Sequence, residues 1–159
     1  MKEDKFARIE KAKREADECR QKALHSLAHC LSRGDVMRHH HDALIKELAN
    51  TGQVFSDVKE ARFAAYIWFW FVSLSAVIER FEQLVANGTI PKSDKLSSLL
   101  TKEFIDIVKP FRNAVAHCSD HDDQRVLNLL NQPHSVPDHA EAIALAFHAY
   151  FKEHTHHQA

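Results

Sequence analysis

Residues that form turns are scarce in this chain, because only three glycines and four prolines occur among 159 residues. Alanine, leucine and the long charged residues, which favour helices, are abundant. Few turns and many helix formers predict long helices instead of many short strands. We therefore expect an all-α fold, an up-and-down bundle of four to six helices. With 45% hydrophobic residues, we expect a single helical domain over 1–159 that buries a substantial core.

The charged residues nearly cancel. The chain has 21 lysines and arginines against 22 aspartates and glutamates, so no net positive field attracts nucleic acid or an anionic membrane. Any affinity for RNA must be local. Cys19, Cys30 and Cys118 form no Cys-x-x-Cys pair, and nothing at the N-terminus resembles a signal peptide. We expect a reduced, cytoplasmic protein in which most of the 13 histidines face solvent.

The N-terminal part of the chain mixes charged and apolar residues at helical spacing. Apolar residues at three- and four-residue steps over 3–32 predict a long amphipathic helix, and Gly34 is expected to end it. The front of this charged N-terminal segment, 1–32, is weakly apolar, so we expect it to project from the body or to pack on a second copy of the chain. A second helix is expected over 36–49, ended by the Asn-Thr-Gly turn at 50–52.

The next expected helix is the most aromatic part of the chain. It lies between a Ser-Asp cap at 56–57 and an Asn-Gly stop at 87–88. Large apolar residues surround it on nearly all sides, which predicts a central helix or one at an interface. We assign Trp68 and Trp70 to packing. The apolar run over 63–78 is shorter than a bilayer needs and ends in charged residues, so we interpret it as a buried helix with no membrane role.

Shorter helices are expected in the C-terminal half. After a linker over 89–93, the apolar pattern of 96–108 predicts a helix that Pro110 kinks or restarts. Two more helices are expected, over 122–131 and over 138–151. Asp138 is expected to cap the second of them. The histidine-rich end beyond them is expected to fray.

One short stretch, Phe111-Arg112-Asn113-Ala114-Val115-Ala116-His117, joins residue types that suit RNA chemistry. A helix restarted after the proline places Asn113 and His117 one turn apart on one face. The Arg112 guanidinium keeps its charge at any relevant pH and matches phosphate oxygens, whereas an imidazole exchanges protons near neutral pH. Together these groups can cleave a phosphodiester without a metal.

The Arg-Asn-x-x-x-His motif at the end of an apolar helix resembles the signature of HEPN domains, which are small all-α proteins. The long aromatic helix before it resembles an element of some bacterial members, so the resemblance covers roughly 60–130 within an expected HEPN-like core at 56–154. The resemblance implies that Arg112 and His117 are the two motif residues. Asn113 then matches the polar residue that often follows the arginine.

The resemblance also implies an activity and partners. The activity is that of a metal-independent endoribonuclease without cofactor, as found among toxins and defence or stress proteins. The partners are a second copy of the chain, RNA, and a separately encoded antitoxin or nucleotidyltransferase. Cleavage through the ribose 2′-hydroxyl needs one group that takes a proton and one that gives a proton, so two chains supply the two histidines.

Each residue then has an expected catalytic role. His117 acts as general base or acid and Arg112 stabilises charge on the phosphate. Asn113 orients the phosphate or the imidazole. Glu79 and His121 are supporting candidates.

Each of these assignments has a structural alternative. Arg112 can pair with Asp106 or Glu103 on the helix surface. His117 can simply cap the helix, and Glu79 can neutralise a neighbouring arginine, which is the role that we prefer for it. The whole domain can instead be a non-catalytic helical module that binds a nucleotide, RNA or a partner protein, and the near-zero net charge favours this alternative mildly.

A metal site is a further alternative, because two sets of ligand residue types lie at helical or near-helical spacing: His25-x-x-x-His29-Cys30 and His117-Cys118-x-x-His121. Neither set matches a paired-cysteine zinc pattern or His-Glu-x-x-His. We therefore expect no metal.

Overall fold

The computed structural model describes residues 2–52, 57–115 and 135–155. These ranges contain helices and no strand, which confirms the expected all-α bundle. The helices are α1 (Lys2–Thr51), α2 (Asp57–Ala86), α3 (Asp94–Leu99), α4 (Lys102–Val115) and α6 (Ser135–Thr155).

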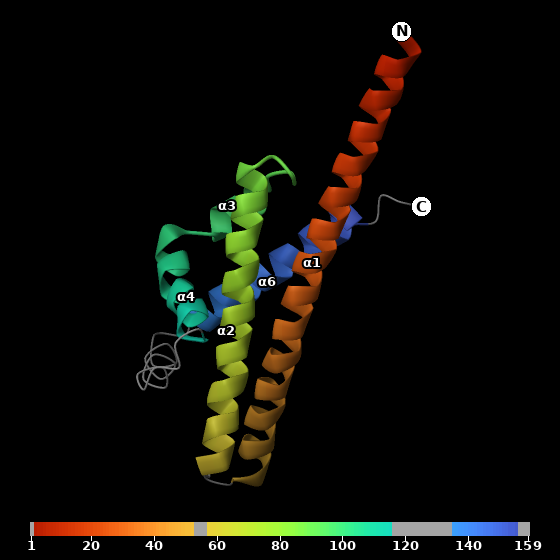
Figure 1. Cartoon of the computed structure of the whole chain (residues 1–159). Helices are drawn as coiled ribbons and strands as arrows, with labels where there is room; N and C mark the ends of the chain where they lie inside the picture. Colours follow the sequence, from red (N-terminus) through yellow and green to blue (C-terminus); the bar gives the residue numbers. More distant parts are fainter. Residues whose placement is uncertain (1, 53–56, 116–134, 156–159) are drawn as a thin grey trace.

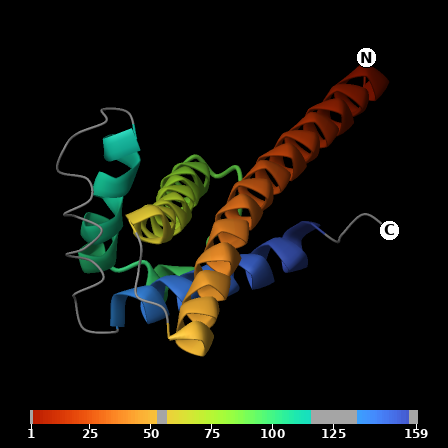
Figure 2. The same ribbon diagram turned by 90° about the horizontal axis from the view of Figure 1, so that it is seen from below.

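The two longest helices, α1 and α2, form an antiparallel hairpin on which the rest of the bundle is built (Figure 1). Helix α4 packs against α2 on the side away from α1, and α6 crosses beneath the pair and contacts α1 and α3 (Figure 2). The aromatic helix α2 is therefore central, as its apolar residues predict.

The core lies where α1, α2, α4 and α6 meet. Phe71 and Phe147 are its largest fully buried side chains. Phe81 of α2 contacts the rings of Phe147 and Tyr150 of α6 edge-on, at 5.2 and 5.3 Å between centroids. The apolar stripe expected on the last helix is buried throughout: Ala140, Ile143, Ala144, Phe147, Tyr150 and Phe151.

Helix α1 runs through Gly34 without a break, so the expectation that this glycine ends a helix is wrong. A Cβ atom at position 34 would lie 2.8 Å from the Cβ of Ser73 on α2. Glycine is needed here because the two helices approach too closely for a side chain. The hairpin turn begins at Gly52 instead, whose positive φ of 60° ends α1 within the predicted Asn-Thr-Gly turn.

Helix α2 ends at the predicted Asn-Gly stop. Gly88 has a positive φ of 68°. Its amide donates to the carbonyl of Val85 at 3.0 Å, and the amide of Thr89 donates to the carbonyl of Leu84 at 2.8 Å. These two bonds are those of a Schellman motif.

Pro110 does not restart a helix, since α4 continues through it to Val115. The break between helices lies earlier, at the Leu100–Thr101 pair. There Thr101 accepts a hydrogen bond from the amide of Phe104 at 3.2 Å and thereby caps α4. Proline has no N–H, so α4 passes it at the cost of one backbone hydrogen bond.

Helix α6 is longer at both ends than its pattern predicts. It begins at Ser135, so Asp138 lies in its first turn and is not its cap. It includes His154 and Thr155, which were expected to fray. The helix expected over 122–131 lies outside the described residues.

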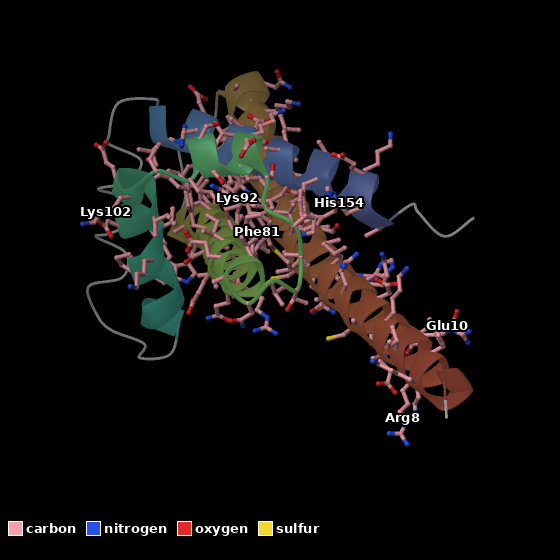
Figure 3. The ribbon with its side chains drawn as sticks, turned by 90° about the horizontal axis from the view of Figure 1, so that it is seen from above. Arg8, Glu10, Phe81, Lys92, Lys102 and His154 are labelled. Atoms are coloured by element: carbon pink, nitrogen blue, oxygen red, sulfur yellow. The ribbon has the colours of Figure 1, made fainter. Side chains whose placement is uncertain are left out.

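The front of α1 projects beyond the body, as expected (Figure 1). Arg8 and Glu10 lie on this projecting part, far from Phe81 in the core (Figure 3). Phe6 is 70% exposed, and the ion pairs here are between residues one helical turn apart, such as Lys11 and Glu15 at 3.9 Å. The packing of this segment on a second copy stays a prediction.

Helix α2 also contains the one stretch in the described part of the chain, Ala61–Ala86, that is long and apolar enough to cross a membrane, so the expectation that this apolar run is shorter than a bilayer needs is wrong. Length and composition are the only grounds for that comparison, and the core helix of a soluble protein meets the same test. One side of α2, through Phe71, Leu74 and Val77, is fully buried in the core.

Tyr150 connects α6 to the linker after α2 by a hydrogen bond. Its hydroxyl donates to the carbonyl of Pro91 at 2.8 Å. Burial raises the pKa of the phenol to about 12. Folding stabilises the neutral form of the phenol. The contribution of this burial to the stability of the fold is therefore present below pH 10 and is lost as the pH rises toward 12.

We expect Tyr150→Phe to lower the free energy of unfolding by about 1 kcal/mol, because the Pro91 carbonyl loses its donor. The variant should also lose the decline in stability between pH 10 and 12 that Tyr150 causes. Urea unfolding at pH 8, 10 and 11.5 measures both effects. Tyr66→Phe is the matched control, and an equal loss in that variant would contradict the role of the Pro91 bond.

Candidate functional site

The predicted RNA motif begins in the last turn of α4, where Phe111 anchors it to α2. Phe111 is 4% exposed. Its ring lies 5.3 Å from that of Phe71 in a stacked arrangement and 5.2 Å from that of Trp68. Aromatic pairs at these separations stabilise packing beyond the area that they bury. The aromatic residues of α2 therefore fix the helical turn that carries the motif.

The structure describes only some of the predicted site residues. Arg112 and Asn113 are consecutive helical residues of α4, directly after the anchored Phe111. His117 and His121 lie outside the described residues. The expectation that Asn113 lies on a short helix restarted after Pro110 is wrong, because it lies near the end of the longer helix α4. The one-turn spacing of Asn113 and His117 stays a prediction.

Glu79 lies on α2, away from the anchored end of α4. It is half-buried, and its Oε1 accepts a hydrogen bond of 3.5 Å from Gln83. Arg80 donates to Gln83 as well, at 3.1 Å. Glu79 follows Phe71 by eight residues, about 12 Å along the helix axis at ~1.5 Å per residue. This geometry favours the structural role of Glu79, in a polar group with Gln83 and Arg80.

No three histidine, cysteine, aspartate or glutamate side chains gather as metal ligands in the described ranges. His25 and His29 are exposed on α1, whereas the thiol of Cys30 points to the carbonyl of Ser73, with 3.9 Å between sulfur and oxygen. Burial raises the pKa of the Cys30 thiol, although the nearby Arg33 opposes the shift. The thiol is therefore held in a helix contact and disfavoured as a thiolate ligand.

A polar cluster that no sequence pattern indicates joins α1 to α6. It consists of Asp35, Arg38, Glu141 and His148. The Arg38 guanidinium contacts Glu141 at 2.9 Å, and His148 Nε2 lies 2.5 Å from Asp35 Oδ2. Residues of each pair lie 103 and 113 positions apart in the sequence, so no local spacing signals them.

This α1–α6 polar cluster has a structural rather than an RNA-binding character. The side chains of Asp35 and Arg38 are only 15% and 21% exposed. Arg38 also lies over the ring of Trp70, with 5.9 Å from Cζ to the centroid. Carboxylates outnumber the guanidinium, so the cluster does not attract a phosphate backbone. Half-buried pairs of this kind hold α6 on α1.

The fold defines the chain as an all-α helical protein. No family model, curated protein or solved structure matches it.

Proposed function

We propose that this chain is a metal-independent endoribonuclease of the HEPN type that cleaves RNA through the ribose 2′-hydroxyl. The observation that carries the proposal is the burial of Phe111 between Trp68 and Phe71, which fixes the turn of α4 that bears Arg112 and Asn113. A catalytic group must be held by a rigid element to act, and a helix anchored in the core provides one.

The reaction needs no atom beyond those of RNA and the side chains. One His117 imidazole takes the proton of the 2′-hydroxyl, whose oxygen attacks the phosphorus. A second His117 imidazole gives a proton to the departing 5′-oxygen. Arg112 stabilises the charge on the pentavalent phosphate, and Asn113 orients the phosphate or an imidazole. The products carry 2′,3′-cyclic phosphate and 5′-hydroxyl ends.

Since each chain has one histidine in the motif, the proposal includes a homodimer in which two motifs act together. We infer a reduced cytoplasmic setting and a toxin, defence or stress role. A separately encoded antitoxin or nucleotidyltransferase is the inferred protein partner.

The proposal is tested with purified protein and RNA in the presence of EDTA. The wild type should cleave, and His117→Ala should lower the rate by about 10²- to 10⁴-fold. His25→Ala, at an exposed position of α1, is the matched control and should cleave like the wild type. Cleavage that stops with the chelator, or that survives in His117→Ala, would reject the mechanism.

A second candidate function is a non-catalytic module that binds a nucleotide, RNA or a partner protein. The near balance of 21 basic and 22 acidic residues favours it, because a general RNA-binding surface is basic. Wild-type protein that binds RNA without cutting it, equally well in His117→Ala, would favour this candidate over the nuclease.

A further inference from the structure

The exposed side of α1 contains no carboxylate over half of the helix. Between Lys22 and Lys46, every exposed residue is a lysine, an arginine, a histidine, a serine or an apolar residue. The cations among them are Lys22, Arg33 and Lys46, spread over about 36 Å at ~1.5 Å per residue. The whole chain has 21 basic and 22 acidic residues, so this side concentrates positive charge that the chain as a whole lacks.

The two carboxylates in this stretch of sequence, Asp35 and Asp42, are engaged elsewhere. Asp35 Oδ2 lies 2.5 Å from His148 Nε2 of α6, and Asp35 Oδ1 lies 4.0 Å from Arg38 Nε. Asp42 Oδ2 lies 3.7 Å from Arg38 Nη1. Both carboxylates thus contact members of the α1–α6 polar cluster, and neither belongs to the exposed residues of the stretch.

The three exposed cations have no counter-charge of their own. Lys22, Arg33 and Lys46 make no ion pair with any residue in the described ranges. Cations gathered on one side of a protein attract an anionic partner. Their separations along the helix are ~16 Å and ~20 Å, so one small anion cannot contact all three. The partner that fits them is an extended polyanion.

An ordered ring lies among these cations. His40 stacks on Tyr66 of α2, with 5.4 Å between ring centroids and 27° between ring planes. His40 is exposed all the same, and it lies about 10 Å along the helix from Arg33. Histidine rings are among the side chains on which unpaired nucleic-acid bases stack. An acidic peptide and inorganic polyphosphate have no base, so this ring favours a nucleic acid as the polyanion.

We propose that Lys22, Arg33, His40 and Lys46, which we call the α1 outer strip, bind single-stranded RNA. The three cations contact phosphates, and one base stacks on His40. A single strand exposes its bases to such a ring, whereas a duplex does not. That the strand is RNA rests on the proposed function, because none of these contacts involves the ribose 2′-hydroxyl.

A lipid surface is a poorer partner for this side of α1. Helices that lie on membranes carry a continuous apolar side beside their cations. The large apolar residues exposed between Lys22 and Lys46 are Val36 and Ile45, at 51% and 40% exposure. Two such residues, nine positions apart, do not form an apolar side.

The α1 outer strip lies away from the proposed site of cleavage. Helices α1 and α4 pack on opposite sides of α2 (Figure 2). With 8–10 Å between packed helix axes, the axes of α1 and α4 are roughly 20 Å apart. An RNA of a few nucleotides at the end of α4 therefore leaves the strip of that chain empty, whereas a long RNA reaches both. The strip then favours long substrates through their binding and takes no part in the chemical step.

The first experiment measures binding by fluorescence anisotropy of a fluorescein-labelled, single-stranded RNA of 30 nucleotides at pH 8. The full chain with His117→Ala is used, so that the RNA stays intact. Adding Lys22→Gln, Arg33→Gln and Lys46→Gln should weaken binding by about 100-fold at 0.1 M salt. The slope of log affinity against log salt should also fall by about 2, because each phosphate contact on a single strand contributes ~0.7.

The matched control removes the same charge from another exposed region. Lys92→Gln, Lys95→Gln and Lys102→Gln replace three exposed lysines that lie beside Asp94 and Glu103 in the sequence. This triple variant should change binding by less than about 3-fold, because salt screens charges that are distant from the RNA. Circular dichroism checks that the helices of both triple variants are intact.

The second experiment tests the stacked base. His40→Ala should weaken binding of the RNA by about 5-fold or more and leave binding of inorganic polyphosphate unchanged. His25→Ala removes an exposed imidazole from the same helix, and it should bind both like the wild type. Equal RNA binding by His40→Ala and the wild type would contradict the stacking role.

The third experiment compares cleavage of RNAs of 40 and 6 nucleotides by protein that retains His117. The substitution of Lys22, Arg33 and Lys46 should raise KM for the long RNA and leave its kcat unchanged. Neither constant should change for the short RNA, which does not reach the α1 outer strip.

Four results would overturn the inference. They are equal weakening of RNA binding by the two triple variants, an unchanged salt slope, tighter binding of DNA of the same sequence, and strip-dependent binding to vesicles of phosphatidylcholine and phosphatidylserine by a protein that binds no RNA. Strip-dependent RNA binding by a protein that cleaves no RNA would support the strip and reject the nuclease. Cleavage of long RNA with KM unchanged by loss of the three cations would do the reverse.

Discussion

Phe111→Ala is expected to lower the free energy of unfolding by about 3–5 kcal/mol. The ring is 4% exposed and lies between those of Trp68 and Phe71, so its loss leaves a cavity between α2 and α4. Urea unfolding followed by circular dichroism measures the change. Phe111→Ala should also cleave RNA more slowly than the wild type, because the turn that carries Arg112 and Asn113 loses its anchor.

The control for this variant is Phe6→Ala. Phe6 is 70% exposed on the projecting part of α1, and its replacement should change stability by less than about 0.5 kcal/mol. A Phe111→Ala variant that is no less stable than Phe6→Ala would show that α2 does not anchor the motif.

Gly34→Ala is expected to destabilise the protein by about 1–3 kcal/mol, although helix propensity alone predicts a gain of about 1 kcal/mol. The new Cβ would lie 2.8 Å from Ser73 Cβ and 3.6 Å from Trp70 Cδ1. Neither atom is the free end of a flexible side chain, so α1 and α2 must separate. Thermal and urea unfolding report the sign of the change directly.

Ser73→Gly supplies the matched partner in a double-mutant cycle. In the Gly34→Ala background it removes the atom that the new Cβ meets, so the double variant should recover at least about 1 kcal/mol relative to the sum of the two single changes. A stabilised Gly34→Ala variant, or strict additivity, would contradict the close contact of the helices.

The three glycines show what the sequence can and cannot reveal about this fold. Gly52 and Gly88 follow helix-forming residues and adopt positive φ, so the local pattern predicts both helix ends correctly. Gly34 follows a similar pattern, yet its role depends on Ser73 of another helix. A local pattern contains no information about such a contact. The end of α3 before Thr101 was missed because Pro110 is the more conspicuous residue, although Thr101 is a good N-cap.

In the candidate site, too, the sequence reveals local patterns but not contacts between distant residues. The Arg-Asn-x-x-x-His spacing is local and is visible in the sequence, and the packing role expected for Trp68 agrees with its contact to Phe111. The pairing of Asp35 with His148 joins residues 113 positions apart, so only the folded chain reveals it. His148 is exposed, as we expect for most histidines, and it is paired with Asp35 all the same.

The central claim is that two imidazoles and a guanidinium cleave RNA through its own 2′-hydroxyl. Mass spectrometry of the RNA ends, after cleavage by the wild-type protein in EDTA, tests it most directly. We expect 2′,3′-cyclic phosphate and 5′-hydroxyl ends that disappear in His117→Ala. Ends with 3′-hydroxyl and 5′-phosphate, which require attack by water, would contradict it.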